Sequence, residues 1–124
     1  MDYKNKSILA RACDPYAAQA FAKAVKKHIG NASYTPTTND SEFFEKLKEQ
    51  QWSVVFFAPG ACRINARGGN IPGASIETKS WSLEDYKKLI HQLQGNDIQI
   101  LETLEEKQTI KSLTEALNIA RTNN

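Results

Sequence analysis

Four consecutive apolar residues, Val54-Val55-Phe56-Phe57, lie in the segment from Trp52 to Ala58. A short run of β-branched and aromatic residues predicts a strand, and its unbroken hydrophobicity indicates burial on both faces of a sheet. The segment from Ile8 to Cys13 begins with a similar run, Ile8-Leu9-Ala10. These two segments are therefore the predicted central strands.

Two further predicted strands are more polar. The segment from Ala32 to Thr35 is short and half polar, and the segment from Asp97 to Leu101 alternates polar and apolar residues. Such patterns are typical of strands at the edge of a sheet. With the strands numbered along the chain, these patterns favour the order 2-1-3-4 in the sheet. The alternative order 3-2-1-4 would place the most apolar strand at an edge.

Four helices are predicted between and after these strands. Their starts are marked by Asp14-Pro15, by residues 39–41, by Ser80 or Ser82, and by Thr103, while Gly30 and Gly95 end the first and third. Their apolar faces recur at helical spacing: Ala18, Phe21, Ala22, Val25 and Ile29; Phe43, Phe44 and Leu47; Tyr86, Leu89, Ile90 and Leu93; Ile110, Leu113, Leu117 and Ala120.

Alternating strands and helices of these lengths predict parallel pairing through right-handed crossovers. We expect one α/β domain over residues 1–124, a three-layer (βα)4 sandwich around a four-stranded parallel sheet. The 124 residues, with 40% hydrophobic and 24% charged content, fit a single globular domain.

Charge and composition argue against several classes of protein. The formal net charge of +2 does not suggest a nucleic-acid binder, and the cluster Lys23, Lys26, Lys27 and His28 complements a helix carboxyl end. No apolar run is long enough to span a membrane, and the polar segment from Met1 to Lys6 does not predict a secretory signal. Two cysteines do not make a disulfide framework, so a reducing, cytoplasmic setting is expected.

The predicted strand order implies where a ligand would bind. In open α/β sheets, ligands bind beyond the carboxyl ends of the strands where the winding reverses, here between the first and third strands. Two loops meet at that place, Cys13 to Tyr16 and Pro59 to Lys79. The second is unusually long for such a connection and holds four of the six glycines and two of the four prolines.

This long loop has the composition of an anion-binding segment. Arg63 and Arg67 carry planar donor groups suited to phosphate or carboxylate, and glycines allow close approach of backbone amides. The alternative is a surface loop whose arginines are solvated or paired with acidic residues. The predicted ligand-binding residues are Cys13, Asp14, Tyr16, Arg63, Arg67, Gly68, Gly69 and Asn70.

The two cysteines suggest an alternative, enzymatic function. Cys13 precedes a predicted helix start, a setting that lowers a thiol pKa, and Cys62 follows the neighbouring strand beside Arg63. The two are thus candidate catalytic residues, as a nucleophile or a redox pair. The competing interpretation is that Cys13 is a small buried residue and that Cys62 is incidental. His28 and His91 lack partners at metal-ligand spacing, so neither a metal nor another cofactor is expected.

The layout resembles the flavodoxin-like fold, and within it the IIB domains of the sugar phosphotransferase system. Those domains carry a phosphorylated cysteine at the end of the first strand, the position of Cys13. The residues that follow, Asp14-Pro15-Tyr16-Ala17, are not the glycine- and serine-rich loop of that family. The resemblance therefore implies a fold and not an activity. Receiver domains and low-molecular-weight phosphatases are excluded because Ala58-Pro59 and Gln19 replace their catalytic residues, and no Cys-x-x-Cys or Walker loop is present.

Three functions follow from these observations. The first is a binding or regulatory module for an anionic metabolite, and the second is a cysteine-dependent enzyme. The third is a protein-interaction module or homo-oligomer that uses an edge strand, Ile71 or Trp81.

Overall fold

The computed structural model describes residues 3, 5–12, 15–57, 83–102 and 106–122. The elements, in chain order, are β1 (Ser7–Arg11), α1 (Pro15–Lys26), β2 (Ser33–Thr37), α2 (Asp40–Glu49), β3 (Val54–Phe57), α4 (Leu83–Gln94), β4 (Gln99–Glu102) and α5 (Glu106–Ile119).

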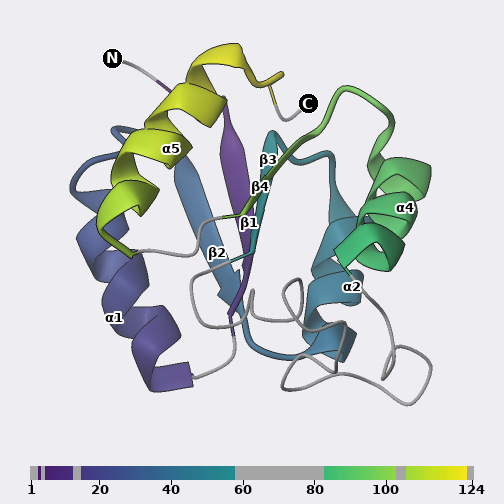
Figure 1. The fold of residues 1–124 in the computed structure, drawn as a ribbon, viewed down its shortest axis with the longest axis horizontal. Coiled ribbons are helices and arrows are strands. Elements are labelled where there is room, and N and C mark those ends of the chain that lie inside the picture. Colours follow the sequence, from purple (N-terminus) through teal and green to yellow (C-terminus); the bar gives the residue numbers. More distant parts are fainter. Residues whose placement is uncertain (1–2, 4, 13–14, 58–82, 103–105, 123–124) are drawn as a thin grey trace.

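The four strands form one parallel sheet in the order β2-β1-β3-β4, which confirms the predicted topology. Helices α1 and α5 cover one face of the sheet, and α2 and α4 cover the other (Figure 1). The result is the predicted three-layer α/β sandwich.

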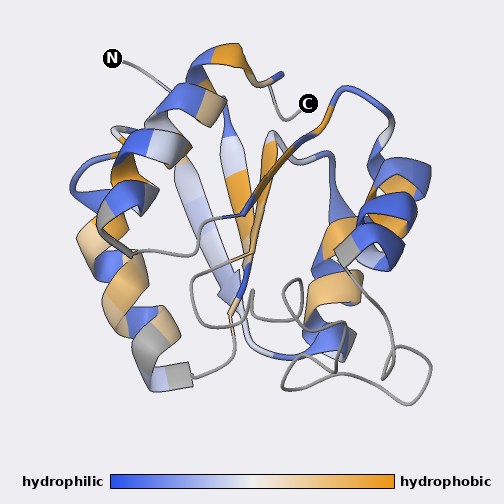
Figure 2. Cartoon of the chain, in the orientation of Figure 1, coloured by the Kyte–Doolittle hydropathy of each residue, from blue (hydrophilic) through white to orange (hydrophobic). Residues whose placement is uncertain are grey.

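Two hydrophobic cores lie on opposite faces of the sheet because successive strand residues point in opposite directions. Ile8, Ala10, Val54 and Phe56 pack beneath α1 and α5. On the other face the core contains Leu9, Val55, Phe57, Ile98, Phe43, Leu47, Trp52, Tyr86 and Ile90, contributed by the strands, α2, α4 and their flanking residues. In Figure 2 hydrophobic residues are concentrated on the central strands, while β2 is mostly pale.

Burial along the strands confirms which ones are central. Every residue of β1 and β3 is buried, whereas all four residues of β4 are only half-buried. Strand β2 mixes buried, half-buried and exposed positions.

Strand β2 runs two residues beyond its predicted end at Thr35 and contains Pro36. The Ser33 N–H donates to the Lys6 carbonyl, and the Thr37 carbonyl accepts from the Ala12 N–H. Alternate residues of β2 therefore face β1, and Pro36 lies at a position whose backbone faces away from it. A proline is tolerated there because no ladder hydrogen bond is lost.

Other boundaries differ from the prediction by a few residues. Strand β1 ends at Arg11, two residues before Cys13, and α5 begins at Glu106 instead of near Thr103. Helix α1 ends at Lys26, and the chain reaches Gly30, at φ 63°, through a turn. Gly95 ends α4 as predicted, with φ 92° and its N–H bonded to the His91 carbonyl.

Tyr34, on β2, is a buried tyrosine whose hydroxyl makes no hydrogen bond among the described residues. Burial raises the pKa of this hydroxyl above its usual value of 10. Tyr34→Phe is therefore expected to leave the free energy of unfolding unchanged at pH 7, or to raise it by up to about 1 kcal/mol. Chemical denaturation of both proteins measures this difference.

The same substitution has an expected pH dependence. Above pH 10 the unfolded chain loses the Tyr34 proton that the folded chain keeps, so the native protein loses stability as the pH rises. Tyr34→Phe removes this part of the alkaline destabilisation. Tyr16→Phe is the matched control, because Tyr16 is 89% exposed. Identical alkaline profiles for the native protein and Tyr34→Phe would contradict the assignment.

Candidate functional site

The candidate site is the place where the carboxyl ends of β1 and β3 meet, the reversal point of the sheet. Strand β1 ends there at Arg11, which pairs in register with Phe57 at the end of β3. Phe57 in turn pairs with Glu102 at the end of β4. Because register partners in a parallel sheet point to the same face, these three side chains form one row on the α2 and α4 face. We call Arg11, Phe57 and Glu102 the edge row.

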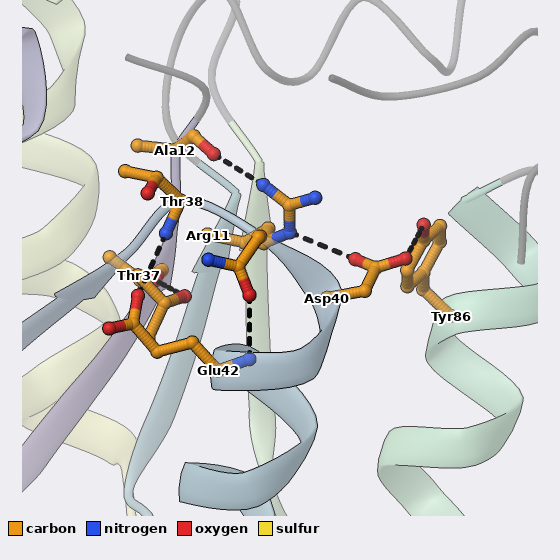
Figure 3. Close-up of polar contacts among 9 residues, drawn as sticks. Arg11, Ala12, Thr37, Thr38, Asp40, Glu42 and Tyr86 are labelled. Carbon is orange, nitrogen blue, oxygen red and sulfur yellow. Dashed lines mark hydrogen bonds and ion pairs between the residues drawn. The ribbon is translucent and has the colours of Figure 1, made fainter. Parts of the chain in front are cut away.

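Arg11 is a fully buried arginine in an ion pair with a fully buried aspartate. Its Nε lies 3.0 Å from Oδ1 of Asp40, the first residue of α2. The other carboxylate oxygen, Oδ2, accepts a hydrogen bond of 2.8 Å from the Tyr86 hydroxyl on α4. Figure 3 shows the three side chains in line, with Asp40 between Arg11 and Tyr86. The network thus joins β1, α2 and α4 at the carboxyl edge.

Arg11 also holds the chain that leaves β1. Its Nη1 donates to the carbonyl of Ala12, the residue just before Cys13 (Figure 3). One guanidinium group therefore links Ala12, the residue that follows β1, to the first residue of α2.

The amino end of α2 is well defined by its caps. Asn39 has extended backbone angles, and its side chain accepts from the Glu42 N–H at 2.8 Å. The Glu42 carboxylate accepts in return from the Thr38 N–H. This reciprocal arrangement positions Asp40, the next residue, against Arg11.

Aromatic rings pack beneath the network. The Tyr86 ring lies edge-on to the Phe57 ring, with centroids 5.9 Å apart, and stacks with the Phe44 ring at a centroid distance of 6.3 Å. The centroids of Phe43 and Phe57 are 6.0 Å apart. The Arg11 and Asp40 side chains are themselves fully buried, and their removal from water strengthens the attraction between the two charges.

Glu102 ends the row on the β4 side and is half-buried. Partial burial raises the pKa of its carboxyl, and the positive charge of Lys87 on α4 opposes part of this rise. The Nζ atom of Lys87 also lies 3.8 Å from Oε1 of Glu84, in the first turn of α4.

Most residues predicted for the site lie outside the described residues. They are Cys13, Asp14, Cys62, Arg63, Arg67, Gly68, Gly69 and Asn70. Tyr16 is described: it is the second residue of α1, at the carboxyl edge, and is 89% exposed. The potential interface residues Ile71 and Trp81 are also outside the described part of the chain.

Sequence-based prediction missed Arg11, Asp40 and Glu102. The sequence places Arg11 within a predicted strand and Asp40 at a predicted helix start, and Glu102 falls just beyond the fourth predicted strand. The available signal was Arg11 itself, because a charged residue at the end of a central apolar strand needs a buried counter-charge. Nothing in the sequence indicated which acidic residue supplies it.

Comparison with known proteins provides no further assignment: no family model, curated protein or solved structure matches the chain. Among the described residues, no three His, Cys, Asp or Glu side chains are grouped as metal ligands would be. None of the described helices is long and apolar enough to cross a membrane.

Proposed function

We propose that this protein binds a small anionic molecule, a metabolite bearing phosphate or carboxylate, at the carboxyl edge between β1 and β3. The observation that carries the proposal is the buried network of Arg11, Asp40 and Tyr86 at the reversal point of the sheet. Open α/β sheets bind their ligands at this point.

The buried ion pair supports a positioning role rather than a stabilising one. Removing both charges from water costs several kcal/mol, and apolar residues of similar volume often give equal or greater stability. What such an ion pair provides instead is a fixed arrangement of the two side chains and of the backbone segments that carry them. Here the pair fixes the amino end of α2 and the chain that precedes Cys13.

The helices contribute a favourable electrostatic field. Helices α1, α2 and α4 all begin at the carboxyl edge, as the strand directions in Figure 1 show. Each helix amino end carries partial positive charge and backbone N–H groups suited to an anion. Lys87, in the first turns of α4, adds a full positive charge on the same side of the sheet.

The loops complete the proposed site. Arg63, Arg67 and the backbone of Gly68-Gly69-Asn70 supply donors to the anion, and Tyr16 supplies an aromatic surface at the start of α1. The long loop belongs in the site because it follows β3, whose carboxyl end lies beside that of β1.

A thermal-shift titration tests this function. Inorganic phosphate, pyrophosphate and a panel of phosphorylated and carboxylated metabolites are added to the native protein. A ligand present at one hundred times its Kd is expected to raise the free energy of unfolding by about 2.7 kcal/mol. The double variant Arg63→Ala/Arg67→Ala is expected to lose this stabilisation.

Lys23→Ala/Lys26→Ala is the matched control, because it removes the same charge from the opposite end of α1. It is expected to keep the ligand-dependent shift. The proposal is wrong if no anion raises the melting temperature of the native protein. It is also wrong if the arginine variant keeps a ligand-dependent rise that the lysine variant loses.

A further inference from the structure

We draw no further inference here: the strongest candidate, the outer edge of strand β4, where all four residues are half-buried at one side of the sheet, carries no proposal because nothing in the described part of the structure shows what covers it.

Discussion

Arg11→Met is expected to lower the free energy of unfolding by about 3–5 kcal/mol, because it leaves the buried Asp40 carboxylate without its cation. Methionine fills much of the space but offers no donor to Oδ1 of Asp40 or to the Ala12 carbonyl. Chemical denaturation at pH 7 measures the loss. The effect should exceed that of any surface substitution in the chain.

Removing the whole network is expected to restore most of this stability. The triple variant Arg11→Met/Asp40→Leu/Tyr86→Phe leaves no unpaired charge or hydroxyl at the three positions, and apolar replacements of buried pairs are often neutral or stabilising. It should nevertheless bind the anion less well, since the positioning contacts are gone. This combination of recovered stability and lost binding separates positioning from stabilisation.

An exposed ion pair provides the control for both variants. Lys46 and Glu49 lie 3.4 Å apart on the surface of α2. Glu49→Gln is expected to cost less than about 1 kcal/mol. If Arg11→Met costs no more than Glu49→Gln, or if the triple variant is as unstable as the single one, the role given to the network is wrong.

Gln94→Ala is expected to lower the free energy of unfolding by about 2–4 kcal/mol, the second largest effect. The buried Gln94 side chain accepts from the Trp52 N–H at 2.7 Å and donates to the Leu47 and Gln50 carbonyls at 2.7 and 2.8 Å. It also accepts from Arg121 near the end of the chain. Truncation leaves several polar groups without partners at the amino edge of the sheet, each costing about 1–3 kcal/mol if it stays buried.

Gln92→Ala is the matched control for Gln94→Ala. Gln92 lies on the same helix and is exposed, so its truncation is expected to change stability by about 0.5 kcal/mol or less. Equal effects of the two substitutions, measured by thermal and chemical denaturation, would contradict the role assigned to Gln94.

The strand order was predictable because the two central strands are more apolar than the two edge strands. Continuous hydrophobicity in Val54–Phe57 identified a strand covered on both faces, and the polar residues of β2 identified an edge. Helix ends were harder to place. Gly30 marked the turn correctly, but α1 ends four residues before it, and Ile29 packs in the core from outside the helix.

The sequence predicts a place for the candidate site and not the residues of its buried network. Strand order alone gives that place, since ligand sites in such sheets follow the reversal point, and the site itself stays a prediction. The partner of Arg11 could not be predicted, because Asp40 lies 29 residues away and reaches it only through the packing of α2 against β1. Glu102 was missed because the predicted strand ends at Leu101, one residue before the observed end of β4.

An NMR titration of the backbone amides tests the central claim most directly. Inorganic phosphate, pyrophosphate and glucose 6-phosphate are added to the isotope-labelled native protein. Binding at the carboxyl edge predicts chemical-shift changes at Ala12, Tyr16, Thr38 and Glu102, with Gly95 at the opposite edge unchanged. Changes confined to the surroundings of Gly95, or no change with any of the three anions, would contradict the account.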